Sequence, residues 1–408
     1  MPLYAAKFGI MTGPLRLPAT GEGGAAIPPE PRLCRSLLQK AESLAVDAYV
    51  FTPKDYNPQS GELLGWRLHL GHWHRQAVPL PDVVYNRCFF HTISDRREAA
   101  ATLSSIYARK AHQFLNSTLP SKIAVYEHLL EDHALSPFLP PTSRYTFETL
   151  KKKLRESSAK WILKPASGMQ GRGIVQIERS PWDRSVSVKG RTRQNRCFAR
   201  NLESESELQA WLSAFINGSP FLLQPYLDLG TADHRPYDIR VLLQKDDSGK
   251  WQRTGSAARI GPSGSLTSNL HGGGSALRAN ELLANHFGKT EAGRLLEHIY
   301  AVSERAAVRL EQGFGRFGEL AFDFGVEPDG RFWLLEANAK PGREVFRLTC
   351  DHHAQLLSIE RPLRYSVYLT NRILPTFIAR DSATGPKGPK RETIPNRPRS
   401  LNVQEVHR

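Results

Sequence analysis

Short apolar runs alternate with amphipathic segments in the first 90 residues. The apolar runs Ala5–Met11 and Asp47–Thr52 flank Arg32–Ala45, where leucines recur at helical spacing. This order of strand, helix and strand predicts a small α/β domain. Alternating apolar positions in Glu62–Val84, interrupted at Gly71, predict a β-hairpin that leads into a further strand.

Helices and strands follow one another through most of the remaining chain. The predicted helices are Arg96–Ala111, Leu119–Leu130, Glu205–Ile216, Leu282–Gln312 and a last one over roughly Arg361–Leu374. The predicted strands are Lys160–Lys164, Ile174–Glu178, Pro220–Leu227, Tyr237–Lys245, Trp251–Ile260, Glu319–Val326 and Arg331–Ala337. Arg179–Arg200 holds seven basic residues and a single acid, which predicts an exposed hairpin or loop. The sequence from Arg380 onward has no periodicity and predicts a disordered basic tail.

Basic residues outnumber acidic ones, and the 408 residues carry a formal net charge of +15. Such a surface attracts polyanions such as nucleotides, nucleic acid, anionic wall polymers or an acidic protein layer. The charge is equally compatible with a solvated basic surface that has no polymer site. Because the basic residues are not interleaved with aromatic ones and no nucleic-acid motif is present, no specific nucleic-acid binding is expected.

The cysteines and the apolar runs exclude several classes of protein. Cys34, Cys88, Cys197 and Cys350 form no C-x-x-C pair, so we expect reduced, mostly buried thiols instead of disulfides or a zinc site. No apolar run reaches the roughly 18 residues of a membrane span. The N-terminus lacks the apolar core of a secretory signal. We therefore expect an intracellular protein.

A glycine-rich loop runs from Ser167 to Gly173 between two predicted strands. Glycines let a backbone approach phosphates closely and point its N–H groups at them. The loop lacks the Walker A pattern, and it is no Rossmann fingerprint because Ile174–Ile177 continues as a strand. The loop therefore predicts a flap over a triphosphate. Lys164 ends the incoming strand and would meet the phosphate charge, although a plain surface lysine remains an alternative.

Three oxygen-bearing side chains lie in the apolar strands near residue 330. Asp323 lies on one strand, and Glu336 and Asn338 lie two apart on its hairpin partner, so the last two share a face. A carboxylate within an apolar run is costly unless it is paired with a cation. Carboxylate and amide oxygens suit Mg²⁺. The pattern predicts a metal site, with a single edge-strand carboxylate paired with an arginine as the alternative.

Cationic and amide groups lie between and beside these two motifs. Arg240 and Arg259 lie on predicted strands, Asn269–Gly274 forms a second glycine cluster, and Arg343 follows the predicted metal ligands. Guanidinium groups suit phosphate oxygens because they donate in a planar fork. His271 has no partner in a motif and is interpreted as a loop histidine.

Taken together, these motifs resemble the ATP-grasp superfamily. KPASGMQGRGI resembles its glycine-rich flap, and FGELAFDFGVEPDGRFWLLEANAKPGR resembles its metal hairpin. The intervening QPYLDLG, RPYDIRVLLQ, ARIG and SNLHGGG are similar to its second lobe. LPDVVYNR and LLEANAKPGR also resemble the YheC/YheD-type endospore coat-associated family. The resemblance implies an α+β ATP-grasp fold in which two lobes sandwich ATP: a pre-ATP-grasp α/β domain at 1–118, a first lobe at 119–218, a second lobe at 219–378 and a basic tail at 379–408.

The resemblance also implies residue roles, with ATP and Mg²⁺ (or Mn²⁺) as cofactors. The residues that would bind ATP are Lys122, Lys164, Ser167, Gly168, Gly171, Arg172, Gly173, Gln224, Tyr226, Leu227 and Asn269. Gln224–Leu227 would form the adenine hinge, and Asp228 is a candidate for the ribose. Asp323, Glu336 and Asn338 would hold the metal, and Arg240 and Arg343 would be the catalytic residues that steady the transferred phosphoryl group.

The activity that this resemblance implies is ATP-dependent ligation of an unknown carboxylate to an unknown amine through an acyl phosphate. The implied setting is sporulation, in the cytoplasm of the mother cell or in the spore coat. A structural coat protein that binds ATP without turnover is the main alternative, with the basic segments docking it onto anionic polymers. Arg87 could bind a substrate carboxylate, but it is interpreted as an ordinary surface residue.

Overall fold

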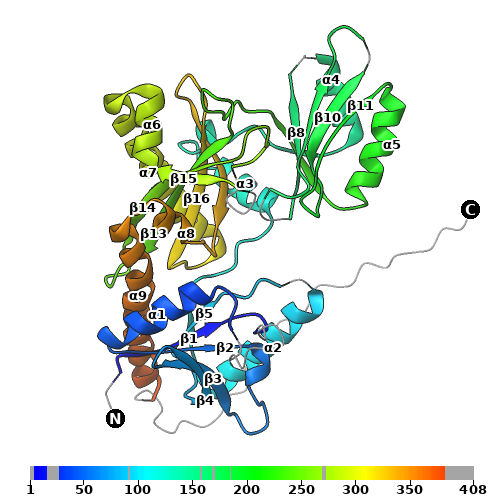
Figure 1. Ribbon diagram of the computed structural model, residues 1–408. Helices are drawn as coiled ribbons and strands as arrows, with labels where there is room; N and C mark the ends of the chain where they lie inside the picture. Colours follow the sequence, from blue (N-terminus) through cyan, green and yellow to red (C-terminus); the bar gives the residue numbers. More distant parts are fainter. Residues whose placement is uncertain are drawn as a thin grey trace, which may run out of the picture. The chain divides into compact units, whose positions relative to one another are not determined.

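The computed structural model describes residues 4–15, 27–90, 92–156, 159–167, 171–183, 185–268 and 273–381, the last nine of these by backbone alone. Residues 1–370 form one compact unit. That unit contains three sheets, which define an N-terminal domain, a first lobe and a second lobe (Figure 1). No helix among the residues described is both long and apolar enough to cross a membrane.

The N-terminal domain has a six-stranded sheet in the order β4-β3-β2-β1-β5-β6. Its strands are β1 (Ala6–Met11), β2 (Val46–Phe51), β3 (Leu63–His69), β4 (His72–Val78), β5 (Val83–Asn86) and β6 (Gln113–Phe114). Its helices are α1 (Pro31–Ser43) and α2 (Ile93–Arg109). The pairs β1–β2, β1–β5 and β5–β6 are parallel, whereas β3 and β4 form the predicted antiparallel hairpin. All residues of β2 are buried, as expected of a parallel strand covered on both faces.

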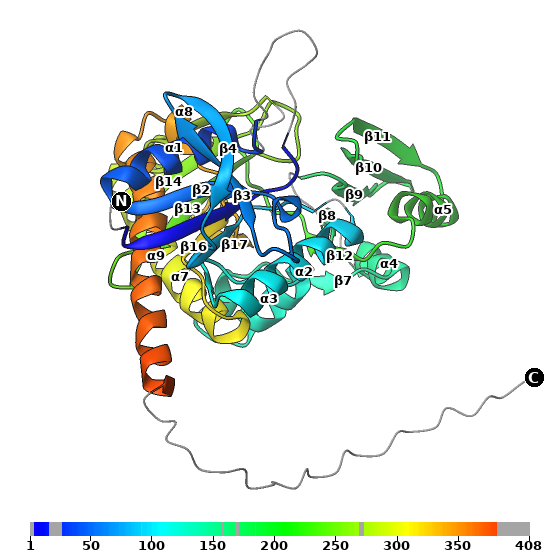
Figure 2. The ribbon, with the colours of Figure 1, turned by 90° about the horizontal axis from the view of Figure 1, so that it is seen from below.

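The first lobe has a second six-stranded sheet, in the order β11-β10-β9-β8-β12-β7. Its strands are β7 (Ser143–Arg144), β8 (Trp161–Pro165), β9 (Val175–Arg179), β10 (Val186–Arg191), β11 (Cys197–Leu202) and β12 (Phe221–Pro225). The helices α4 (Phe147–Glu156) and α5 (Glu205–Ile216) bury leucines against it, and Figure 2 shows both on this lobe. The basic segment predicted as an exposed hairpin is β10 and β11, although Val186 and Val188 are buried.

The second lobe has a five-stranded antiparallel sheet in the order β15-β14-β13-β16-β17. Its strands are β13 (Tyr237–Lys245), β14 (Trp251–Ile260), β15 (Ser275–Arg278), β16 (Glu319–Val326) and β17 (Phe332–Asn338). Its helices are α3 (Lys122–Leu130), α6 (Ala279–Phe287), α7 (Lys289–Phe314) and α8 (Glu344–Leu348). The single helix expected over Leu282–Gln312 is divided at Gly288, which adopts a positive φ of 80°.

The sheets divide the chain differently from the boundaries expected at 118 and 218. β12 lies beyond residue 218 but pairs with β8, so it belongs to the first lobe. α3 lies after residue 118, yet its Val125 and Leu129 are part of the core of the second lobe. Strand pairing and helix burial join segments that are far apart in the sequence, so a division into consecutive ranges misses both.

The last helix, α9 (His352–Asp381), begins nine residues before the predicted start at Arg361. Pro362 reads as a helix start in the sequence because proline lacks an N–H and suits a first turn. Inside α9 it leaves the Ser358 carbonyl without its helical donor. The side chains of Arg343 and Gln244 donate to this oxygen at 2.9 and 3.0 Å. Tertiary contacts therefore satisfy the group that the proline exposes.

Candidate functional site

A pocket of about 1750 Å³ is lined by the N-terminal domain and both lobes. Most of the predicted site residues contribute to its wall. Those that do are Lys122, Lys164, Ser167, Gly171, Arg172, Gln224, Tyr226, Leu227, Arg240, Asp323, Glu336 and Asn338, together with Asp228. Gly173 lies beside the pocket on the same flap. Gly168, Asn269 and His271 lie outside the described residues.

The glycine-rich flap joins β8 to β9, as predicted, and two of its positions require glycine. Gly171 has a φ of 65°, and a Cβ there would lie 2.8 Å from the Cγ2 of Thr267. Gly173 has a φ of 74°, and its Cβ would lie 3.0 Å from the Cγ of Pro165. Positive φ is strained for side chains other than glycine. The flap thus packs closely against a loop of the second lobe, which carries Thr267.

Two lysines line the pocket near the flap. Lys164 lies on β8, and Lys122 is the first residue of α3, which Ser121 caps. The Lys122 Nζ lies 3.2 Å from the Glu336 Oε1. Burial and, secondarily, the positive charge of Lys122 lower the pKa of Lys164 to about 8. A lysine that is this poorly solvated favours an anionic ligand.

Strand register brings the predicted catalytic and metal-binding residues together. Arg240 on β13 lies opposite Asp323 on β16, and Asp323 lies opposite Glu336 on β17. Arg240 donates to both Asp323 carboxylate oxygens at 2.8 Å, and Arg259 lies 3.0 Å from one of them. Burial opposes ionisation of Asp323, but these two arginines more than offset it and hold its pKa below the ordinary value. Asp323 is therefore a charged carboxylate at neutral pH.

Arg259 also binds a second buried acid, Asp238, through two hydrogen bonds of 2.7 Å. The two residues lie opposite each other in the β13–β14 pairing. Ser268 donates a further hydrogen bond to Asp238. The loop that meets the flap is therefore connected through Ser268 and Asp238 to Arg259 on the sheet.

The oxygen atoms on this sheet are of the kind that binds Mg²⁺, but they already have partners. Asp323 pairs with Arg240 and Arg259, as in the alternative of a carboxylate paired with an arginine, and Glu336 pairs with Lys122. A bound ion would have to displace these contacts. Proteins commonly hold that ion with one or two carboxylates while phosphate oxygens and water complete the coordination. Asp323 and Glu336 offer two carboxylates and Asn338 an amide oxygen, and the Asn338 Nδ2 lies 3.3 Å from the Asp323 Oδ2. In the described part of the chain, no group of three or more His, Cys, Asp or Glu could hold a metal.

The predicted adenine hinge follows the end of β12. The Gln224 side chain donates to the Thr142 Oγ1 at 2.5 Å, and the Tyr226 N–H donates to the Lys160 carbonyl at 2.8 Å. These bonds fix the segment's backbone beside β8. Tyr226 remains partly exposed and Lys160 lies 6.0 Å from the centre of its ring. The segment presents a partly apolar edge to the pocket, which suits a purine ring.

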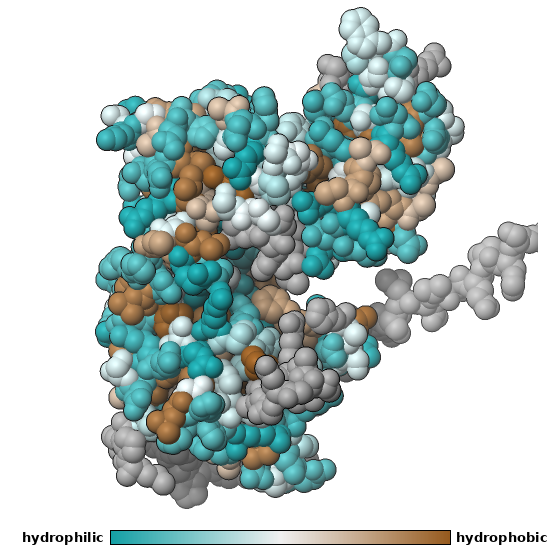
Figure 3. Space-filling view, in the orientation of Figure 1, coloured by the Kyte–Doolittle hydropathy of each residue, from teal (hydrophilic) through white to brown (hydrophobic). Residues whose placement is uncertain are grey.

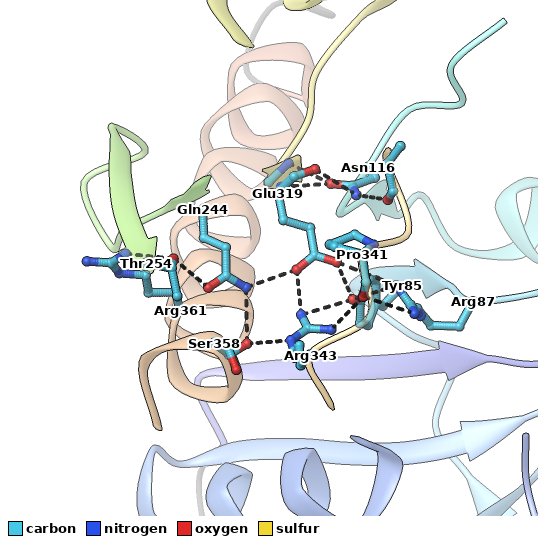
Figure 4. A network of polar contacts seen from close by, with 12 residues as sticks. Tyr85, Arg87, Asn116, Gln244, Thr254, Glu319, Pro341, Arg343, Ser358 and Arg361 are labelled. Carbon is cyan, nitrogen blue, oxygen red and sulfur yellow. Dashed lines mark hydrogen bonds and ion pairs between the residues drawn. The ribbon is translucent and has the colours of Figure 1, made fainter. Parts of the chain in front are cut away.

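Arg343, predicted as catalytic, is not part of the pocket wall. Figure 4 shows its guanidinium group in a buried network, where it contacts Glu319, Tyr85 and the Ser358 carbonyl. Glu319 is completely buried and also accepts hydrogen bonds from Gln244 and Tyr85. The guanidinium group is thus committed to an internal carboxylate, so in this structure Arg343 fixes the loop after β17 instead of facing the pocket.

The interpretation of Arg87 as an ordinary surface residue is wrong, since its side chain is 1% exposed. It donates to both carboxylate oxygens of Glu30 at 2.9 and 2.5 Å. It also lies 3.7 Å from Glu319, and Figure 4 shows these two residues in the same buried network. The alternative, in which Arg87 binds a substrate carboxylate directly, conflicts with these two ion pairs. Arg87 still borders the pocket, where it positions Glu30.

Sequence reasoning assigned no role to Glu30, Glu319 or Lys340. Glu319 begins the apolar strand that contains Asp323, so the same argument about costly buried carboxylates applies to it. Lys340 lies two residues beyond Asn338 and could have been noticed through that spacing. Glu30 adopts a left-handed conformation just before α1, and no pattern in the sequence marks it.

Residues 111–369 match the protein family described as YheC/D like ATP-grasp. Endospore coat-associated protein YheC of Bacillus subtilis (strain 168) is 27% identical over 338 residues, which are 82% of this chain and 91% of that protein. Endospore coat-associated protein YheD of the same strain is 28% identical over 326 residues, which are 80% of this chain and 71% of that protein. The solved structure of D-cycloserine synthetase DcsG is similar over 90% of this chain and 99% of its own, with 12% identity and a TM-score of 0.49. A likeness this weak carries no information about substrates.

Proposed function

The chain belongs to the YheC/D-like ATP-grasp family, with the α+β ATP-grasp fold, and we propose that it binds Mg-ATP in this pocket and activates a carboxylate for attack by an amine. The main support is the arrangement of the pocket wall. A flap glycine, two lysines, the proposed catalytic arginine and the three proposed oxygen ligands come from several elements and line one cavity. A protein with only a structural role would not need residues of these types to line the same pocket.

In the proposed first step, a carboxylate oxygen attacks the γ-phosphorus of ATP, and ADP leaves with the electrons of the broken P–O bond. Lys122 and Lys164 offset triphosphate charge, and Arg240 donates to the transferring phosphoryl oxygens. Mg²⁺ held by Asp323, Glu336 and Asn338 would supply further positive charge at the phosphates. Positioning and charge compensation are the main catalytic work of phosphoryl transfer.

In the second step, a neutral amine attacks the acyl carbon, the amide forms and inorganic phosphate leaves. The amine must lose one proton, which the departing phosphate can accept. No cysteine or histidine nucleophile is required. The flap, packed against Thr267, would exclude water and so protect the acyl phosphate from hydrolysis. Gln224, Tyr226 and Leu227 would hold the adenine, and Asp228 would bind the ribose.

Arg343 has a different role in this proposal from the one the motif implies. Its pairing with Glu319 fixes the segment from Ala339 to Arg343, which directly follows the metal ligand Asn338. It is therefore proposed as a positioning residue, while Arg240 remains the catalytic arginine.

We also propose a sporulation setting for this chain, because the two curated relatives are named as endospore coat-associated proteins. A coat protein that binds ATP without turnover is the competing function. The complete set of Asp323, Glu336 and Asn338 supports turnover, since a purely structural protein has no need of all three.

The test is ADP formation by the purified protein with a panel of carboxylates and amines. We expect substrate-dependent ADP release, and we expect Glu336→Ala to lower it at least about 100-fold because a metal ligand is lost. Glu297→Ala, at an exposed position on α7, is the control and should leave the rate unchanged. Tight Mg-ATP binding without ADP release across the whole panel would favour the structural function instead.

A further inference from the structure

The N-terminal sheet meets the pocket at its topological switch point. From β1 the chain crosses to β2 on one side, and β5 lies on the other side of β1. In open parallel sheets, ligands bind outside the carboxyl ends of the strands at such a point. Gly13 and Pro14, just after β1, and Arg87 and Phe89, just after β5, line the pocket. The fold therefore provides a second binding region opposite the glycine flap.

The loop after β17 closes this region from the side of the second lobe. Asn116 donates to the Ala339 carbonyl at 2.6 Å, Arg87 to the Pro341 carbonyl at 3.3 Å and Lys340 to the Cys88 carbonyl. These bonds connect the loop directly to the N-terminal domain. Lys340 thereby lies both on the pocket wall and two residues beyond the proposed metal ligand Asn338.

Among the described residues of this region, Lys340 is a cation for which no ion pair with an acid is formed. Both carboxylate oxygens of Glu30 bind Arg87, and Arg87 also lies near Glu319. Lys340, in contrast, has no carboxylate within ion-pair distance among the residues described between 27 and 372. Its ammonium group contacts a carbonyl and lies 5.5 and 5.6 Å from the ring centres of Phe89 and Phe90. A half-buried ammonium group of this kind attracts an anion.

The remaining wall of this region is mostly apolar. Its side chains are Pro14, Pro28, Pro29, Phe89 and Val345. Such a wall favours an apolar ligand body, since contact removes apolar surface from water. Glu30 is paired with Arg87, and Glu344, which lines the pocket beside Val345, is paired with Arg32 and Arg347. Among the described residues, the region therefore offers no unpaired acid to a ligand ammonium group. A zwitterion is thus disfavoured compared with a simple carboxylic acid.

We propose that this region binds the carboxylate substrate as an acid with an apolar body, whose carboxylate pairs with the Lys340 ammonium group. The assignment rests on the proposed ligase function and names the substrate class for it. Lys340 follows Asn338 closely, so a carboxylate on Lys340 lies near the groups that would hold Mg-ATP. Phe89 and the prolines then select the body of the acid.

The probe for this proposal is 3-phenylpropionate, titrated calorimetrically into the full chain with and without Mg²⁺ and a non-hydrolysable ATP analogue. Its neutral amide and the zwitterion phenylalanine are the comparison ligands. We expect the acid to bind at least about tenfold more tightly than either, because a charge-assisted contact is involved. Equal affinities for acid and amide would overturn the proposal, as would the absence of acid binding under both conditions. Because the three ligands are compared on the unaltered chain, misfolding of a variant cannot affect the result.

Variants then locate the site. Lys340→Met should weaken acid binding about tenfold or more, Lys340→Arg should restore it to within about threefold, and Lys152→Met, at an exposed position on α4, should have no effect. Acid binding that is unchanged in Lys340→Met would contradict the assignment. Nucleotide affinity, measured in the same titrations, distinguishes the two proposals. Acid binding without Mg-ATP binding contradicts only the ligase function, and Mg-ATP binding without acid binding contradicts only this inference.

Discussion

Charged side chains in this protein are either presented to the pocket or enclosed between elements. Lys164 and Arg240 line the pocket, although Arg240 also pairs with Asp323 there. Arg343 and Arg87 are almost fully buried and pair with Glu319 and Glu30. All four are similar basic residues in the sequence. An arginine committed to a buried carboxylate is costly to release, so Arg343 and Arg87 are poor candidates for a phosphate contact. Arg240 binds Asp323 through Nε and Nη2, so Nη1 is the nitrogen that would meet a phosphate.

The lowered pKa of Lys164 predicts that nucleotide binding depends on pH. Its pKa of about 8 means that it loses its charge between pH 7 and 9, so we expect the Kd for Mg-ATP to rise by roughly tenfold over that interval. Calorimetry at pH 7, 8 and 9 measures this. Lys164→Arg keeps its charge and should flatten the profile, and an unchanged profile in that variant would assign the titration to another group.

The lowered pKa of Lys164 makes the folded state more stable as the pH rises, whereas it makes nucleotide binding weaker. In the unfolded chain the lysine has its ordinary pKa of 10.5, so between about pH 8 and 10.5 the unfolded state binds more protons than the folded state. The contribution of Lys164 to the free energy of unfolding therefore increases with pH across that window, while nucleotide affinity falls.

Helix α9 connects the second lobe to the N-terminal domain. Its Ala354 packs in a cluster with Phe346 and Leu242, whereas its Leu363, Tyr365 and Leu369 are part of the core around β1 and β2 (Figure 1). Because the helix belongs to both cores, it ties the N-terminal wall of the pocket to the sheet that carries Asp323. The residues of α9 that follow Pro362 thus pack against the N-terminal domain.

Substitution of one buried and one exposed leucine of α9 tests whether the helix packs against the N-terminal core. Leu363 is fully buried, and Leu363→Ala should lower the free energy of unfolding by about 2–5 kcal/mol because a core cavity forms. Leu356, on the same helix, is 51% exposed, and Leu356→Ala should change it by less than about 0.5 kcal/mol. Urea unfolding measures both variants, and equal losses would show that Leu363 is not a core residue in solution.

The whole molecule combines a strongly basic composition with a pocket that has its own acids. Hydrophilic side chains cover most of the face in Figure 3, and apolar ones occur in small groups. The net charge of +15 belongs to the complete sequence and cannot be assigned to the pocket, where Asp238, Asp323, Glu336 and other acids offset the lysines and arginines. The overall positive charge therefore predicts attraction to polyanions, but it does not by itself predict nucleotide binding in the pocket.

We accordingly expect DNA binding that depends on salt and not on sequence. Raising the salt concentration from 50 to 200 mM should increase the Kd for double-stranded DNA at least about tenfold, because condensed counterions are released on binding. Two unrelated duplexes of equal length should give the same Kd and the same salt slope in a fluorescence anisotropy titration. A marked preference for one duplex would revive the nucleic-acid-binding function that the sequence argues against.

The sequence by itself determined the elements and the motifs that lie on contiguous segments. β13, β14, β16 and α5 have the bounds that periodicity predicts, because hydrophobic spacing is a local property. The family was also predicted from it, and the glycine-rich loop between β8 and β9 lies where the sequence places it. Only the tertiary structure decided that β12 pairs with β8, that Arg343 and Arg87 are buried, and that Lys340 faces the pocket. Such features depend on contacts between residues tens to hundreds of positions apart, such as Tyr85 with Glu319, and no local pattern in the sequence records them.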